Sequence, residues 1–394
     1  MPTRPSLPGV YLQEAPASPP AIAALSTAVT AFVGHTPDGP VHQPLAVRSG
    51  LDFERLFGGL APGSTLGPAV QQFFDNGGTE ALVVRLPPGA KGITAWLPTA
   101  QAARARRQGI YALDAAEHFN LLCLPPPSRS KDFSPAAWAR AATYCQQRRA
   151  LLLVDAPGHW TSVADALNGM DELQAAVAPA ALANAAAYFP RLHAAPPAAG
   201  QNPISFAPCA AVAGLMARTD AHRGVWKAPA GSEATLSGMV GTSLAPTEAQ
   251  LAELAGVGLN AVRSLPGRGL LVWGARTLAG HNALASEWKY VPVRRLALHI
   301  EQSVLRGTQW VVFEPNDAPL WARLRASVTN FLTTIWRQGG LMGQKPEEAF
   351  FVRCDGSTTT AADIAAHRLH LHIGIAPLKP AEFVLLRLTL QTAA

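Results

Sequence analysis

Three histidines form the densest group of potential metal ligands in the sequence: His367, His370 and His372, in the run HRLHLH. Alternate residues of a β-strand lie on one face, so His370 and His372 would share one side of a strand. A metal site needs a further ligand at suitable spacing, and the neighbouring sequence places none there. We therefore expect a solvated or pH-sensitive strand face, with no metal and no other cofactor.

Ser243 is the candidate nucleophile, because the run Gly241-Thr-Ser-Leu-Ala-Pro246 is similar to the serine motif of subtilisin-like proteases. Such a serine needs a base that takes its proton and a carboxylate that orients the base. Those proteases place Asp-(Thr/Ser)-Gly and His-Gly-Thr ahead of the serine. Here Asp155 is followed by Ala-Pro-Gly, and the sequence holds no His-Gly-Thr. The pattern favours a loop or helix N-cap position for Ser243, and an α/β serine hydrolase that uses it is kept only as an alternative.

Two further features indicate no cofactor or catalytic chemistry. The run from Gly256 to Ala261 matches GxGxxA, but a dinucleotide fingerprint follows a strand and opens a helix. This run follows a predicted helix and precedes a predicted strand, which is typical of a helix C-cap and turn. Asp155 ends a predicted buried strand without a partner acid, base or glycine-rich cradle. No phosphate-binding GxxxxGK[ST] motif is present, so we expect no enzymatic activity and no catalytic residues.

Composition limits the function classes further. The 394 residues suffice for two or three domains, and 48% of them are hydrophobic, whereas only 15% are charged. Such low charge is compatible with a subunit that covers much of its surface in an assembly, and also with an ordinary alanine-rich protein. The net charge is +6, and no basic tract alternates with aromatic residues, so nucleic acid is excluded as the main ligand.

No run of 18 apolar residues is present, so no membrane insertion is expected. The cysteines lie far apart and fit buried positions in a reducing compartment: Cys123, Cys145, Cys209 and Cys354.

Local patterns predict α/β and α+β architecture. The apolar run 27–34 fits a strand buried on both faces. Ser49 and Ser64 have the spacing of N-caps for two short helices, and Ser134-Pro135 begins a longer one. From residue 119 the chain alternates strand and helix, which favours a mostly parallel sheet covered by helices. That arrangement is also found in subtilisin-like enzymes, although their catalytic residues are missing here.

Five segments follow from these patterns. They are an extended N-terminal arm (1–25), an N-terminal α/β unit with its connection (26–118), a middle α/β domain (119–275), a C-terminal core domain (276–380) and a C-terminal strand arm (381–394). The first arm is rich in proline and too poor in apolar residues to fold alone.

The segment 288–316 is the most informative part of the C-terminal domain. It holds the pair Arg294-Arg295 and a helical run through Ile300–Ser303, and the apolar run 309–313 is predicted to be a strand. A helix is predicted over 318–338, with one apolar stripe: Leu320, Leu324, Val328, Phe331 and Ile335. The opposite face is wet and carries Arg323, Asn330 and Arg337.

The order of these elements resembles that of the contractile tail sheath proteins of bacteriophages and phage-tail-like injection machines. The similar runs are collinear: PGVY, TAVTAFVGHTPDGP, LDFERLFGG, QQFFDNGGTEALVVRL, YFPRL, ARTDAHRGVWKAP, LNAVRSLPGRGLLVWGARTL, WKYVPVRRL, GTQWVVFEPNDAPLW, EEAFFVRCD and IGIAPLKPAEFV. They extend over nearly the whole chain. The chain is shorter than large phage sheaths and lacks room for their extra surface domains.

The resemblance implies an assembly subunit. Sheath subunits stack as six-fold rings around an inner tube and contract to drive the tube through a target envelope. The implied partners are copies of this chain, the inner tube protein, baseplate and terminator or cap proteins, and possible sheath paralogues. The implied location is the bacterial cytoplasm during assembly and then a phage tail, a tailocin or an extracellular injection particle. A static, non-contractile tube or shell protein is the remaining alternative.

The two arms are the predicted links between subunits, because exposed strand segments can complete the sheet of a neighbour. The arm residues are Val10, Tyr11, Leu12 and Gln13 at one end, and Phe383, Val384, Leu385, Leu386, Arg387 and Leu388 at the other. In this family the wet face of a C-terminal-domain helix touches the tube. Arg323 and Arg337 are therefore the candidate tube contacts.

Overall fold

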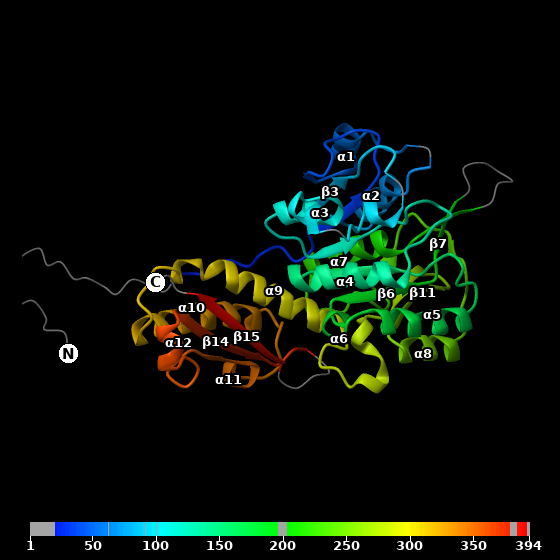
Figure 1. The fold of residues 1–394 in the computed structure, drawn as a ribbon. Coiled ribbons are helices and arrows are strands. Elements are labelled where there is room, and N and C mark those ends of the chain that lie inside the picture. The colour runs from blue at the N-terminus through cyan, green and yellow to red at the C-terminus, as the bar shows by residue number, and fades with distance from the viewer. Residues whose placement is uncertain are drawn as a thin grey trace, which may run out of the picture.

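The computed structural model describes residues 20–61, 63–90, 92–99, 101–195, 203–378 and 384–391. Figure 1 shows an elongated molecule with a large α/β domain at one end and a smaller α+β domain at the other. Helix α9 (Val291–Gly307) extends from the large domain along the smaller one. The mixed α/β fold predicted from the sequence is confirmed.

One nine-stranded sheet organises the large domain. Its order is β2 (Pro44–Val47), β3 (Ala81–Arg85), β1 (Thr30–Gly34), β4 (Leu121–Cys123), β5 (Leu151–Asp155), β6 (Ala185–Phe189), β11 (Leu259–Leu265), β12 (Gly269–Trp273) and β9 (Thr235–Leu236). The six strands from β3 to β11 are parallel, and the strands at both ends are antiparallel. Because β1 pairs with both β3 and β4, the expected boundary at residue 118 falls inside this sheet.

Helices cover both faces of the sheet, as a buried parallel sheet requires. One face packs against α1 (Gly50–Phe57), α2 (Leu66–Asp75) and α7 (Cys209–Arg223). The other packs against α4 (Pro135–Arg148), α5 (Val163–Ala176), α6 (Pro179–Leu182) and α8 (Glu248–Gly256). Strands β1, β5 and β6 are buried at every residue. The two apolar cores lie on opposite faces of the same sheet.

Short elements complete the large domain. The connection from β3 to β4 contains η1 (Ile93–Ala95), α3 (Gln101–Ala105) and η2 (Gly109–Ala115). A small sheet joins β10 (Gly241–Thr242), β7 (Leu192–Ala194) and β8 (Ile204–Phe206). The helical turns η3 (Leu278–Gly280) and η4 (Asn282–Leu284) lead into α9. The small sheet and strand β2 were not anticipated from the sequence, because each strand has only two to four residues and no clear alternation.

The predicted helix caps are confirmed by their hydrogen bonds. Ser49 Oγ accepts from the Asp52 amide at 3.1 Å, and Gly58 ends α1 with a left-handed φ of 80°. Ser134 caps α4 ahead of Pro135. Ser64 Oγ accepts from the Gly67 amide at 3.4 Å, although the residue directly before α2 is Thr65. Local sequence therefore determines where these helices begin.

The C-terminal domain packs α9 and α10 (Ala318–Arg337) with a three-stranded antiparallel sheet. The strands are β13 (Phe350–Arg353), β14 (Arg368–Ile375) and β15 (Val384–Gln391), with short helices α11 (Pro346–Ala349) and α12 (Ala361–Ala365) beside them. The predicted stripe of α10, from Leu320 to Ile335, is buried in this core. The amphipathic pattern correctly identified the inward face of the helix.

The strand predicted over 309–313 is wrong. Residues Gln309–Val311 form a 3₁₀ turn, η5, and the chain then turns back into α10. Phe313 has a φ of 76° and an 85% exposed side chain. The apolar run was ambiguous because short apolar segments fit either a strand or a buried turn. The segment forms the connection between α9 and α10, and no strand of the described chain pairs with it.

Candidate assembly surfaces and domain junction

The side chains that suggested catalysis are not assembled into a catalytic site. Ser243 is exposed in the loop between β10 and α8, and its amide donates to the Arg191 carbonyl at 2.9 Å. The N-cap of α8 is Thr247, so Ser243 is a loop residue. Gly258, with a φ of 84°, lies in the turn between α8 and β11, as predicted for a segment that follows a helix. These positions are explained by backbone geometry alone.

His370, one of the two histidines of β14, lies beside an acidic helix cap. His370 and His372 are half-buried on one side of the strand, while Leu369, Leu371 and Ile373 are buried on the other. His370 Nε2 lies 3.3 Å from Asp363 Oδ1 in α12. Within the described ranges, no three His, Cys, Asp or Glu side chains come together as a metal site would require. Strand alternation therefore gave the correct face for His370 and His372.

Asp155 ends β5 and is almost fully buried. Its Oδ1 accepts from the Cys209 amide at 2.8 Å, at the start of α7. Burial raises the pKa of this carboxyl to about 6, against the opposing effects of the Cys209 hydrogen bonds and the Arg191 charge. The bond from β5 to α7 gives Asp155 a structural role that its isolation in the sequence did not reveal.

A buried ion pair joins the two domains. Arg295 in α9 binds Asp220 in α7 through two contacts, Nη1 to Oδ1 at 2.9 Å and Nη2 to Oδ2 at 2.6 Å. The two side chains are only 3% and 6% exposed. Thr27 completes the group, because its carbonyl accepts from Arg295 at 2.9 Å and its hydroxyl donates to Asp220 at 2.6 Å. We call this group the Thr27–Asp220–Arg295 junction.

Further polar contacts extend the junction along α9. Arg294 donates to Asn184 Oδ1 at 3.0 Å and lies 3.6 Å from Glu301. Glu301 also lies 3.3 Å from Arg149, and Gln302 donates to the Arg149 carbonyl at 2.9 Å. The sequence drew attention to Arg294-Arg295 and to Glu301-Gln302, but not to their partners. The signal that could have identified them is charge on the otherwise buried face of an apolar helix.

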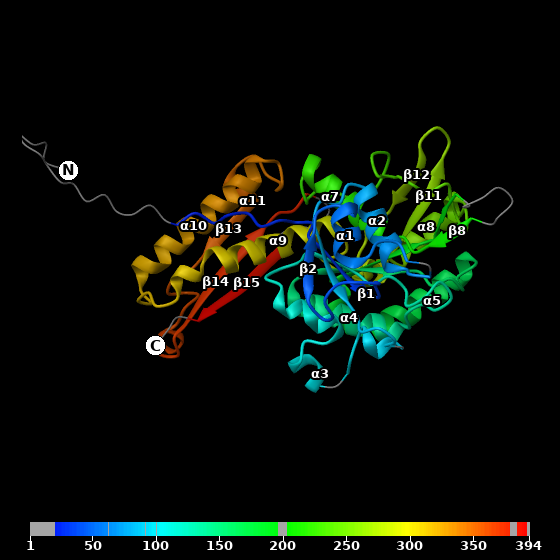
Figure 2. The same ribbon diagram turned by 90° about the horizontal axis from the view of Figure 1, so that it is seen from above.

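Both ends of the described chain lie close to the connection between α9 and α10. Ile22 packs against Gly307 at the end of α9, where an added Cβ would lie 2.8 Å from the Ile22 side chain. Gln391, the last residue of β15, pairs with Arg368, whose carbonyl accepts from Asn316 in the connection at 3.0 Å. Figures 1 and 2 show this region at the end of the molecule farthest from the large sheet.

The C-terminal arm residues from Val384 to Leu388 lie in β15, which forms the outer strand of its sheet. It pairs antiparallel with β14 of the same chain, from Ile375 with Val384 to Arg368 with Gln391. Val10 to Gln13 and Phe383 lie outside the described residues. The exchange of either arm between subunits stays a prediction.

The two candidate tube contacts on α10 differ in their surroundings. Arg337 is exposed in the last turn of the helix, and Asn330 is exposed on the same side. Arg323 is partly covered, because its guanidinium lies 4.8 Å from the Trp310 ring centroid and 3.4 Å from Glu314. Arg337 is therefore the more available charge for a contact. No helix in the described part of the chain has the length and apolar character to cross a membrane.

The structure consists of a long α/β body joined to a small α+β domain with an outer strand, β15. Family models identify the class of protein that has these two parts: residues 99–278 match the phage tail sheath protein central domain, and residues 285–391 match the phage tail sheath C-terminal domain. The chain belongs to the phage tail sheath protein family.

Solved sheath structures are similar over almost the full chain. The helical sheath of the anti-feeding prophage (AFP) in its contracted state is 32% identical to this chain, and the match has a TM-score of 0.71. The alignment covers 97% of this chain and 98% of the AFP chain. The contracted sheath of the extracellular contractile injection system PVC is 29% identical, with a TM-score of 0.74, and the alignment covers 98% of this chain and 97% of the PVC chain. The sheath tail protein Lin1278 from Listeria innocua shares the fold at 10% identity, with a TM-score of 0.63 and coverage of 94% and 96%. A comparison with curated protein sequences found no significant match.

The junction predicts a large loss of stability in Arg295→Ala. Removing the guanidinium leaves the Asp220 carboxylate buried without its counter-ion, which costs about 3–5 kcal/mol. Urea unfolding of the full chain measures the change. The matched control is Arg223→Ala, at the exposed Arg223–Glu233 pair on the same helix as Asp220, where a change below about 1 kcal/mol is expected. Equal effects of the two substitutions would contradict the role of the junction.

His299, one turn after Arg295, predicts an acid-dependent loss of stability. Burial, followed by the Arg295 charge, lowers its pKa from 6.5 to about 4. Between pH 6.5 and 4, His299 is therefore protonated in the unfolded chain but stays neutral in the folded chain. The folded state loses stability as the pH falls through this range. The loss is at most about 3.5 kcal/mol, because each tenfold difference in proton affinity corresponds to about 1.4 kcal/mol.

Asp155 acts in the opposite direction over the same range. Its folded pKa of about 6 lies above the unfolded value of 3.8, so the folded chain gains stability as the pH falls below 6. Urea unfolding between pH 7 and pH 4 separates the two groups. Relative to the unmodified chain, His299→Gln should gain stability toward pH 4, and Asp155→Asn should lose it. Parallel pH profiles for all three proteins would show that neither group titrates as described.

Proposed function

We propose that this chain is the subunit of a contractile sheath, which polymerises as stacked six-fold rings around an inner tube and contracts to drive the tube through a target cell envelope. The observation that carries the proposal is the match, at 29% and 32% identity over nearly the whole length, to the contracted sheaths of PVC and AFP. A related match is to the AFP baseplate complex, at 30% identity. This supports a baseplate as a further partner. Assembly in the bacterial cytoplasm before release is part of the same proposal.

Strand exchange is the proposed link between subunits. β15 is an outer strand that pairs with β14 through main-chain hydrogen bonds. The edge of β14 could form the same main-chain hydrogen bonds with the C-terminal strand of another copy, because these bonds do not depend on which copy the strand comes from. The N-terminal arm is proposed to add to a neighbour in the same manner. A head-to-tail contact of this kind propagates into an open helical polymer.

The domain junction supports a sheath that changes its packing without unfolding. The Thr27–Asp220–Arg295 junction ties residue 27 and α9 to α7, so each subunit can rotate as one body. Flexible links between rigid bodies permit two stable lattices and a transition between them. In this proposal the strands keep neighbours connected while the bodies rearrange.

Tubular assembly is the first test of the proposal. The purified full chain should form tubes with helical order in negative-stain micrographs, whereas chains lacking residues 1–14 or 381–394 should stay unpolymerised because their linking strands are gone. Circular dichroism confirms that the truncated chains remain folded. Well-formed tubes from a chain that lacks both segments would exclude strand exchange. Absence of tubes from the full chain in the presence of inner tube protein would count against the sheath function itself.

Arg337 is the proposed contact with the inner tube, supported by Arg323 on the same face of α10. Charge reversal in Arg337→Glu should weaken co-sedimentation of the sheath with purified tubes by about tenfold, because a favourable ionic contact becomes repulsive. Arg223→Glu, on α7 of the large domain, is the matched reversal and should leave tube binding unchanged. Equal binding by both variants would remove α10 from the tube interface.

A further inference from the structure

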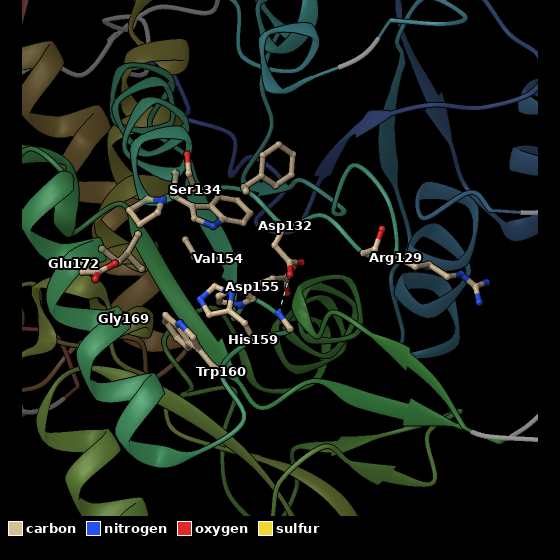
Figure 3. Close-up of a pocket in the computed structure, with 16 residues that line it drawn as sticks. Arg129, Asp132, Ser134, Val154, Asp155, His159, Trp160, Gly169 and Glu172 are labelled. Carbon is tan, nitrogen blue, oxygen red and sulfur yellow. Dashed lines mark hydrogen bonds between the residues drawn. The ribbon is translucent and has the colours of Figure 1, made fainter.

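A cavity of about 590 Å³ lies at the carboxyl end of β5, in the large domain. Its walls come from the start of α4, the loop 157–160 and one side of α5 (Figure 3). The carboxyl ends of parallel strands are the usual place for ligands in open α/β sheets, and the volume is that of a small-molecule site. The cavity shares no lining residue with β15, α10 or the domain junction.

Asp155 provides an unused hydrogen-bond acceptor at this cavity. The residue is 6% exposed and lines the cavity, and its Oδ1 is bound to the Cys209 amide. Its Oδ2 is buried and has no hydrogen-bond partner within the residues that the structure describes. A buried carboxylate oxygen without a donor costs free energy. A donor placed in the cavity would remove this cost.

The charge of the cavity favours a cationic donor. Three carboxylates line it, those of Asp132, Asp155 and Glu172. Asp132 is already bound, to Arg191 at 2.9 Å and to the Gly158 amide at 2.8 Å. The guanidinium of Arg129 lines the cavity mouth but points away from it in Figure 3. Asp155 and Glu172 therefore leave an excess of negative charge, which a bound cation would reduce.

Aromatic rings form the apolar walls. Trp138 and Trp160 are 4% and 8% exposed, and Phe133 packs on Trp138 with ring centroids 5.0 Å apart. Trp160 lies directly on Gly169, where an added Cβ would come within 2.1 Å of the indole. The glycine thus permits the indole to occupy this position. Indole rings attract cations through their faces and also cover the apolar stem of an amine.

We propose that this cavity binds an organic cation: a primary ammonium or guanidinium group on a short apolar stem. The N–H groups of the cation bond to the Asp155 carboxylate, the stem lies against Trp138 and Trp160, and Glu172 at the mouth adds attraction. The cation is either a free amine or a basic side chain of a neighbouring copy, which present the same chemistry to the pocket. Binding does not require polymerisation, so this inference stands apart from the sheath function.

Isothermal titration calorimetry of the full chain with agmatine tests the inference, since agmatine carries both an amine and a guanidinium. We expect saturable binding with a stoichiometry of one per chain. Asp155→Asn keeps the acceptor for the Cys209 amide but removes the charge, and should weaken binding by about tenfold or more. Glu172→Gln, at the exposed mouth, should weaken it a few-fold without affecting the fold. Glu253→Gln, an exposed carboxylate on α8, is the matched control and should bind as the unmodified chain does.

Three outcomes would overturn the inference: no saturable heat with agmatine, equal affinity in Asp155→Asn and Glu253→Gln, or binding of neutral glucose but not of agmatine. A repeat on polymerised protein distinguishes the sources of the cation. Retained binding assigns the site to a free amine. Binding that is present in the unpolymerised chain and lost on polymerisation assigns it to a basic side chain of a neighbouring copy.

Discussion

The contact between Arg295 and Asp220 is the constraint on which the arrangement of the two domains depends. Both charges are buried, and removing them from water is costly unless each is fully hydrogen-bonded. Four hydrogen bonds, shared with Thr27, meet that requirement at one point. Since the partners come from the segment before β1, from α7 and from α9, correct burial of the pair requires all three segments to be in place. The pair therefore specifies how the domains meet, more than it adds to net stability.

The same junction explains how a subunit can transmit force under the function proposed here. The large sheet and the C-terminal domain are joined through α9, and Ile22 and Gln391, near the two ends of the described chain, lie near the far end of this helix. A pull on an end is therefore carried along α9 to the junction and on to α7. Strand β15 lies in the small domain, where it pairs with β14 and runs beside α9 (Figure 2). The strand proposed to link subunits is therefore part of the C-terminal domain and not of the large sheet.

The motifs that suggested chemistry show how position decides function. Ser243 has the neighbours of a nucleophile in sequence but lies exposed in a loop. The GxGxxA run is a turn after a helix, and His370 is next to a helix cap. Asp155, in contrast, had no motif around it. The tertiary structure nevertheless places it on a cavity with two indoles and an unsatisfied oxygen, so its importance could be recognised only from neighbours distant in the sequence.

The sequence alone determined the features that depend on local periodicity and backbone chemistry. These include the buried strands β1 and β5, the caps at Ser49 and Ser134, and the buried stripe of α10, because strand alternation, capping and helical spacing act within a few residues. It did not determine the pairing of β1 with β4, the turn at 309–313, or the partners of Arg295 and Asp155. Those depend on side chains far apart in the chain, including Asp220 and Cys209. These side chains come within hydrogen-bonding distance only in the folded chain. Burying a charge without a partner costs free energy, so the arrangement in which each buried charge has its partner is favoured over the others.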